Sequence, residues 1–181
     1  MTTWVALLRG INVGGRNMVA MADLKKLCAR IGFEEARTLL QSGNVVFRCS
    51  ERDAGALEAR LEQALQKRLG FAPAVFVRNA SEWAALVKRN PFPEQAVRDP
   101  GHLLAVLMRH APTKAAVSAL RAAIPGREQV EARGREAYFY YPDGVGRSKL
   151  TPALVDKHLG GSGTARNWNT VLKLQAILSS D

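Results

Sequence analysis

RTLLQSGNVVFRC, residues 37–49, decides the fold because it places two strands next to each other in the chain. Residues 37–41 and 45–49 are strand-like runs, and Ser42-Gly43 between them is typical of a hairpin turn. Strands joined by so short a turn pair antiparallel, whereas parallel strands need a long crossover. The stretch therefore predicts a β-hairpin in the middle of the N-terminal half.

The segments around this hairpin complete an order of strands and helices. Residues 3–9 and 74–78 are two further strand-like runs. Two helical patterns lie between them, each followed by a glycine, with apolar positions at Leu24, Leu27, Cys28 and Ile31, then at Leu57, Leu61, Leu65 and Leu69. The resulting β-α-β-β-α-β order is that of a ferredoxin-like unit, an antiparallel sheet with helices on one face.

The C-terminal half repeats most of this order. A helix capped by Ser81 ends at Asn90-Pro91, and the proline-rich residues 91–101 are interpreted as a linker. Strands are expected at 102–109, 128–133 and 136–141, with helices near Val117 and after Thr151-Pro152. A final helix capped by Thr164 is expected where the last strand would fall. We therefore predict an α+β protein of two ferredoxin-like (βαββαβ-type) units with antiparallel sheets, residues 1–90 and 102–181, the second ending in a helix.

Composition indicates an ordinary globular protein. Of the 181 residues, 47% are hydrophobic and 23% are charged, which argues against disorder. No stretch approaches the roughly 18 apolar residues of a membrane helix, and the N-terminus has no basic leader. The two cysteines form neither a disulfide framework nor a CxxC pair. We expect a cytoplasmic protein with no membrane partner.

The charge balance favours an anionic partner. The formal net charge is +10, divided into +6 for residues 1–90 and +4 for residues 91–181, so the chain has no basic tail. A dispersed positive excess is compatible with nucleic acid or with a phosphorylated ligand. It is equally compatible with an arginine-rich surface that has no specific partner.

Five separated segments closely resemble an uncharacterised bacterial family, domain-of-unknown-function family 1697 (DUF1697). They are LLRGINVGGRN (7–17), MADLKKL (21–27), QSGNVVF (41–47), YYPDGVGRSKL (140–150) and TARNWNTVLKL (164–174). The resemblance runs from about residue 5 to residue 175. It implies a small cytosolic α/β protein in two parts, and it implies no established activity and no catalytic residues.

The first of these segments raises the question of an anion-binding loop. Glycines at 10, 14 and 15 could turn backbone N–H groups inward, and Arg9 and Arg16 add charge before a predicted helix N-terminus. The sequence matches neither GxxxxGK[ST] nor GxGxxG, so no nucleotide fingerprint applies. The alternative is a strand-to-helix connection whose glycines serve only turn geometry.

Three other segments could contribute polar groups. In TARNWN, Arg166 and Asn167 would occupy the first turn of the last helix, where arginine opposes the helix dipole. GVGRSK brings two cations and a hydroxyl to a helix N-terminus, and QSGN offers amides at a hairpin tip. Structural pairing, a solvated turn and turn stabilisation are the respective alternatives.

We hypothesise that LRGINVGGRN, GVGRSK and TARNWN converge on one basic, amide-rich cleft, because each is a glycine-bearing approach to a predicted helix N-terminus and carries arginine with asparagine or serine. The residues of this predicted anion cleft are Arg9, Gly10, Asn12, Gly14, Gly15, Arg16, Asn17, Gln41, Ser42, Asn44, Arg147, Ser148, Lys149, Arg166, Asn167 and Asn169.

Binding of a phosphorylated small molecule or nucleotide is the leading functional prediction. Nucleic-acid binding is an alternative, because an alternating Tyr138–Tyr141 strand could expose two aromatic rings for base stacking, although RNP1 spacing is absent. An unrecognised transferase or hydrolase is the third alternative. The sequence contains no HExxH, CxxC or GxSxG motif, so it identifies no catalytic residue, metal or cofactor.

Overall fold

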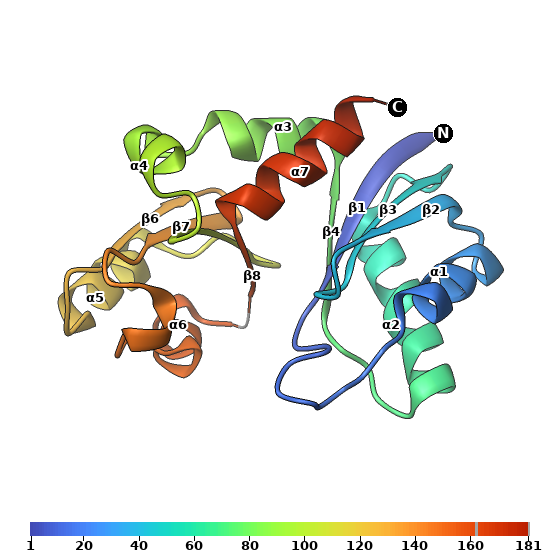
Figure 1. Ribbon diagram of the computed structural model, residues 1–181, viewed down its shortest axis with the longest axis horizontal. Coiled ribbons are helices and arrows are strands. Elements are labelled where there is room, and N and C mark those ends of the chain that lie inside the picture. Colours follow the sequence, from blue (N-terminus) through green and yellow to red (C-terminus); the bar gives the residue numbers. More distant parts are fainter. Residues whose placement is uncertain (162, 181) are drawn as a thin grey trace. The chain divides into compact units, whose positions relative to one another are not determined.

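The computed structural model describes residues 1–161 and 163–180, which form two compact units (Figure 1). One unit comprises Met1–Ala85 with Lys173–Asp181, and the other comprises Leu86–Leu172. The division falls inside helices α3 (Ala80–Lys88) and α7 (Trp168–Ser179). It differs from the expected division in assigning the end of the chain to the first unit.

The first unit is a four-stranded antiparallel sheet with two helices on one face (Figure 1). The strand order is β2-β3-β1-β4. In chain order its elements are β1 (Thr2–Leu8), α1 (Met21–Arg30), β2 (Glu34–Leu39), β3 (Asn44–Cys49), α2 (Ala54–Leu69) and β4 (Val75–Asn79). The hairpin predicted from residues 37–49 is β2–β3, which pairs with Leu39 opposite Asn44.

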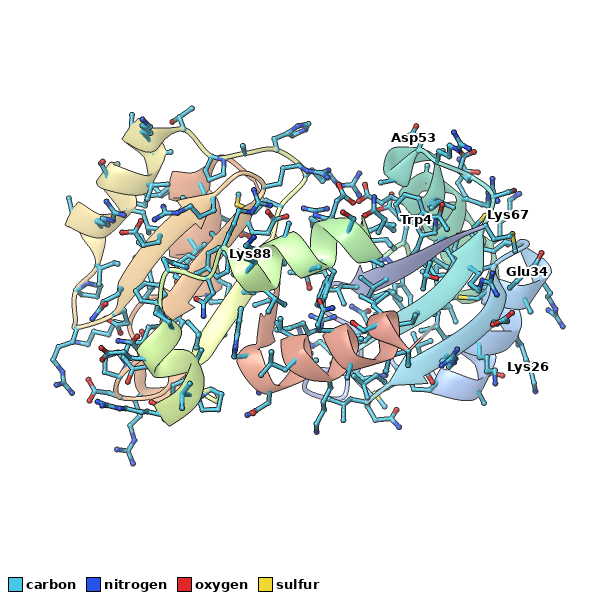
Figure 2. The ribbon with its side chains drawn as sticks, turned by 90° about the horizontal axis from the view of Figure 1, so that it is seen from above. Trp4, Lys26, Glu34, Asp53, Lys67 and Lys88 are labelled. Atoms are coloured by element: carbon cyan, nitrogen blue, oxygen red, sulfur yellow. The ribbon has the colours of Figure 1, made fainter. Side chains whose placement is uncertain are left out.

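Burial in this unit follows the alternation of the strands. One face of the sheet packs against α1 and α2, which cover it. The residues in this core include Trp4, Val45, Phe47 and Val77 of the strands, Leu24 and Cys28 of α1, and Leu57, Leu61 and Leu65 of α2. Figure 2 shows Lys26, Glu34 and Lys67 pointing outward from this unit, whereas Trp4 lies inside it and is only 2% exposed. The period-two and period-four patterns of the sequence therefore correspond to one core.

The second unit has the same topology. Its sheet order is β6-β7-β5-β8, and the face carrying Val106, Val130 and Phe139 is covered by α5 and α6. The elements are α4 (Pro93–Arg98), β5 (Leu103–Leu107), α5 (Lys114–Ala123), β6 (Gln129–Arg133), β7 (Glu136–Tyr140), the 3-10 turn η1 (Val145–Arg147), α6 (Pro152–Leu159) and β8 (Thr164–Asn167). Two ferredoxin-like units are therefore confirmed.

Several predicted helix ends are confirmed. The Thr151 side chain accepts a hydrogen bond from Leu154 N–H at 3.2 Å, as an N-cap should. Gly70, the glycine expected after the second helical pattern, ends α2 in the left-handed conformation, and Gly160 ends α6 in the same way. These ends were predictable because capping is local chemistry.

Two local predictions were wrong. Residues 164–167 form a strand paired with β5, not the first turn of a helix, so the last strand of the repeat is present. Asn79, not Ser81, caps α3: its Oδ1 accepts from Glu82 N–H at 2.8 Å. Helix α4 lies within residues 91–101, which stay a predicted linker. In β8, pairing with a strand that lies 57 to 63 residues earlier in the chain outweighs the local helical pattern.

Candidate functional site

The LRGINVGGRN segment folds into a small hairpin of its own in the first unit. Val13 and Arg16 form an isolated antiparallel bridge, and Gly14 and Gly15 between them have φ of 58° and 74°. Two successive positive φ values are those of a type I′ turn, which glycine adopts without strain. The glycines therefore serve a tight turn whose tip, with Arg16, is exposed.

The asparagines of this loop bind its own backbone. Asn12 Oδ1 accepts from Val19 N–H at 2.7 Å, and its Nδ2 donates to the carbonyls of Val19 and Gln41 at 3.0 and 2.7 Å. Asn17 Nδ2 donates to the Gly10 carbonyl at 3.1 Å. These amides stabilise the loop and connect it to the β2–β3 turn.

The QSGN segment lies beside this loop; its Asn44 side chain faces inward, whereas Gln41 is exposed. Asn44 is fully buried and donates to the Leu39 carbonyl at 2.7 Å and to Ser42 Oγ at 2.9 Å. Leu8 N–H donates to the Gly43 carbonyl at 2.9 Å. The turn-stabilising interpretation of QSGN therefore accounts for these contacts.

Arg166 is a buried side chain of β8. It is 9% exposed, and its Nη1 donates to Thr164 Oγ1 at 2.9 Å and to the Ala165 carbonyl at 2.7 Å. Burial lowers its pKa to about 10. Asn167 caps α7 by accepting from Thr170 N–H at 3.0 Å, and Asn169 is exposed on that helix.

The same junction occurs in the first unit, where sequence reasoning missed it. Arg78-Asn79 at the end of β4 matches Arg166-Asn167, and Arg78 Nη1 also donates to the preceding carbonyl, at 2.9 Å. Arg78 is 1% exposed. Arg78 lies opposite Val5 of β1, and Arg166 lies opposite Ala105 of β5. Strands β1 and β5 hold the same place in the two sheets. The repeated Arg-Asn before a helical pattern was the available signal.

GVGRSK lines a cavity in the second unit. This cation cavity, of about 230 Å³, is bounded by Pro125, Gly126, Arg127, Glu128, Asp143, Arg147, Ser148 and Lys149. Ser148 Oγ donates to Glu128 Oε1, and it accepts from Leu150 N–H at 2.9 Å. The loop is thus fixed to the start of β6 by its serine, while Arg147 and Lys149 are exposed at the rim.

Two carboxylates shape the charge of this cavity. Arg127 forms a two-contact ion pair with Asp143, and this hydrogen bonding lowers the pKa of the Asp143 carboxyl. Glu128 Oε2 is buried and has no hydrogen-bond partner among the residues that the structure describes. A carboxylate oxygen only accepts, so this position suits a hydroxyl or amine donor.

A second hollow adjoins the cation cavity. This mixed cavity, of about 290 Å³, shares Gly126 and Glu128 with it and is otherwise lined by Phe92, Arg121, Ile124, Gln129, Val130 and Glu131. Phe92, Ile124 and Val130 make part of its wall apolar. Because two lining residues are shared, a single ligand could span both hollows.

A histidine cluster lies behind the Asp143-Gly144 turn. Asp99 Oδ2 contacts His102 Nδ1 at 2.9 Å and accepts from Tyr140 OH at 3.1 Å. Desolvation and the hydrogen bond to Asp99 raise the pKa of Tyr140. The α4–β5 turn brings Asp99 to His102, and the pairing of β5 with β7 brings Tyr140 beside them.

The predicted aromatic strand exposes little surface for stacking. Tyr138 is fully buried, with its OH donating to the Leu86 carbonyl at 2.8 Å, and Phe139 and Tyr141 belong to the core. Only Tyr140 of the four is partly exposed. Base stacking by a pair of rings on this sheet is therefore not available.

The chain is similar to one described family and to solved structures. The model of a family described as "Protein of unknown function (DUF1697)" matches residues 1–138. A structure of the conserved bacterial protein SP0830 from Streptococcus pneumoniae has a TM-score of 0.75 at 21% identity and covers 98% of each chain, which supports the fold alone. None of the curated proteins matches the chain. Within the described residues, no helix is long and apolar enough to cross a membrane.

Proposed function

The chain belongs to the DUF1697 family, and we propose that its second unit binds a phosphorylated small molecule or nucleotide in the cation and mixed cavities. The observation that carries this proposal is the joining of a cation-lined hollow to a partly apolar one through Gly126 and Glu128. Together the two volumes fall in the range of about 300–1,000 Å³ that small-molecule sites occupy.

Each part of the site has a distinct role in this proposal. Arg147 and Lys149 at the rim of the cation cavity attract the phosphate, and Arg127 adds a guanidinium that Asp143 holds in place. Glu128 Oε2 accepts from a ligand hydroxyl or amine at the junction of the cavities. Phe92, Ile124 and Val130 contact the less polar body of the ligand.

In the first unit, Arg9 and Arg16 of the LRGINVGGRN segment stay predicted anion-binding residues. The asparagines of this segment support the loop, so anion binding there would come from the two arginines and from the exposed Gly14–Gly15 turn. Both cysteines are free and buried, which supports a place for the protein in the reducing cytoplasm.

A thermal-shift screen with phosphosugars, nucleotides and oligonucleotides tests the proposal, since binding to the folded state raises its stability by mass action. Arg147→Ala and Lys149→Ala should each lower the affinity for the phosphorylated ligand by about 10- to 100-fold, which is the contribution of one charge-assisted contact. Arg98→Ala, an exposed arginine of α4, is the matched control. Unchanged affinity in both cavity variants would remove the proposed site.

Salt dependence separates a small ligand from nucleic acid. Contacts to many phosphates give a steep fall of log affinity with log salt, whereas one phosphate gives a shallow one. A steep slope with an oligonucleotide, lost in variants outside the cation cavity, would favour nucleic-acid binding instead.

A second function, acid–base catalysis, is favoured by the Asp99–His102 pair. A carboxylate bonded to Nδ1 orients an imidazole so that Nε2 can exchange a proton with a substrate. Any ligand found in the screen should be assayed for turnover with the normal protein and with His102→Ala. Equal turnover in both proteins would exclude His102 from the chemistry.

A further inference from the structure

Strand β6 is an edge strand, and its register fixes which backbone groups face outward. Tyr141 N–H donates to the His102 carbonyl and Met108 N–H donates to the Arg135 carbonyl, so the odd-numbered residues from 135 to 141 bond toward β5. The even-numbered residues of β7 therefore bond toward β6, where their partners are Gln129, Glu131 and Arg133. Val130 and Ala132 consequently direct their N–H and C=O groups away from the sheet.

The outward carbonyls are already occupied by arginines. Arg121 Nε donates to the Val130 carbonyl at 3.0 Å, and Arg133 Nη1 donates to the Ala132 carbonyl at 2.9 Å. Both guanidinium groups also pair with Glu131, at 2.5 and 3.1 Å. The outward N–H groups of Val130 and Ala132 have no hydrogen-bond partner within the described part of the chain. This edge therefore offers donors and positive charge, but few free acceptors.

A hollow lies along the same edge. This edge cavity, of about 440 Å³, is lined by the α5 residues Lys114, Val117, Ser118 and Arg121, by Ala111 and Pro112 before them, and by residues 131–134. Three cations, Lys114, Arg121 and Arg133, face one carboxylate, Glu131. The edge cavity therefore has a positive balance beside the two outward N–H groups.

We propose that the β6 edge and the edge cavity bind an extended acidic peptide segment of another protein, which goes beyond the small-ligand function above. Val130 and Ala132 are two residues apart, so their N–H groups repeat at about 6.6–6.8 Å, the spacing of carbonyls that point one way along an extended chain. The peptide's carboxylates take the guanidinium groups of Arg121 and Arg133 from Glu131. The N–H groups of the peptide then donate to the carbonyls of Val130 and Ala132, which the two arginines have left.

Glu131 holds the free edge closed in this arrangement. A bare edge strand invites unwanted pairing, and charged side chains placed across it prevent that pairing. The Arg121–Glu131–Arg133 group does this for neutral strands, whereas an acidic strand competes directly with Glu131. The edge thereby selects partners by charge.

The test uses the full chain and a fluorescein-labelled nonapeptide of alternating aspartate and valine, with a lysine-for-aspartate peptide as the charge control. Amide hydrogen exchange measured by NMR should slow at Val130 and Ala132 when the acidic peptide binds. Gln129, Glu131 and Arg133 serve as internal references, because their N–H groups already pair with β7. No binding of the acidic peptide, or binding without slower exchange at Val130 and Ala132, would overturn the proposal.

Variants of the edge make the test specific. Ala132→Pro removes an outward N–H donor without removing a hydrogen bond to β7. It should therefore lower the affinity for the acidic peptide at least 10-fold while the circular dichroism spectrum is retained. Arg133→Ala should lower the peptide affinity about 10-fold, and Glu131→Gln should raise it about 3- to 10-fold. Arg98→Ala should change nothing. A folded Ala132→Pro that binds normally contradicts the proposal, and so does peptide-independent protection that rises with protein concentration, which would identify a second copy as the occupant.

Discussion

Asn12 binds both main-chain groups of Val19, accepting from its N–H at 2.7 Å and donating to its carbonyl at 3.0 Å. The amide side chain thus replaces a neighbouring strand for a residue that is buried in the core. Asn12 has a φ of 54°, a conformation that asparagine adopts more readily than most residues. A loop that could be read from sequence as a ligand cradle is therefore ordered by its own polar groups.

Replacing Asn12 should destabilise the protein. Asn12→Ala removes three hydrogen bonds to backbone groups and should lower the free energy of unfolding by about 2–3 kcal/mol. Asn12→Asp should cost at least as much, because it places an oxygen against the carbonyls of Val19 and Gln41. Urea unfolding measures both. Asn169→Ala, at an exposed position of α7, should stay within about 0.5 kcal/mol of the normal protein.

Gly43 is confined by the end of β1. A Cβ at this position would lie 2.6 Å from Ile11 Cδ1 and 2.9 Å from Leu8 Cβ, and φ is 74°. The Ile11 side chain can rotate, but Leu8 Cβ is fixed by the sheet. Gly43→Ala should therefore cost about 3 kcal/mol, against about 1–2 kcal/mol for Gly14→Ala, which has positive φ and open space. If both variants lost the same stability in thermal unfolding, the positive φ alone, and not the contact with Leu8, would set the cost of the substitution.

The two Arg-Asn junctions should respond alike to loss of their caps. Asn79 and Glu82 bond each other reciprocally, at 2.8 and 2.9 Å, and Asn167 accepts from Thr170 N–H and Oγ1 at 3.0 Å. Asn79→Ala and Asn167→Ala should each lower stability by about 1 kcal/mol. Ser81→Ala, at the position first expected to cap α3, should have little effect in the same unfolding assay.

The order of elements was predictable because apolar periodicity and helix caps are written locally, as Leu57 to Leu69 and Thr151 illustrate. Strand β8 was not, because Thr164–Asn167 is short and polar and becomes a strand only by pairing with β5. The cavities were not predictable either. Their walls combine residues 125–128 with residues 143–149 or with Phe92, and only the fold brings these together.

Cys28 should make the protein less stable in alkali. Burial raises the pKa of its thiol from 9.0 to about 12. The unfolded chain therefore loses this proton first, so stability should fall as pH rises from about 9 to 12, by up to about 1.4 kcal/mol per pH unit. In Cys28→Ala this part of the slope should disappear while other titrations remain. Parallel slopes for the two proteins in urea titrations at pH 8–11 would contradict the assignment.

Arg147 and Arg166 should separate ligand binding from folding, although both belong to the predicted anion cleft. Arg166 is 9% exposed and bonded to Thr164 and Ala165, whereas Arg147 is exposed at the cation cavity. Arg166→Ala leaves a hole and broken polar contacts at β8, so it should lower the free energy of unfolding by about 2–4 kcal/mol. Arg147→Ala should leave the free energy of unfolding within about 0.5 kcal/mol of the normal protein and should lower the affinity for the phosphorylated ligand instead. If Arg166→Ala kept full stability and lost only ligand affinity, the side chain would be a binding residue, and this result would support the convergence of TARNWN with GVGRSK.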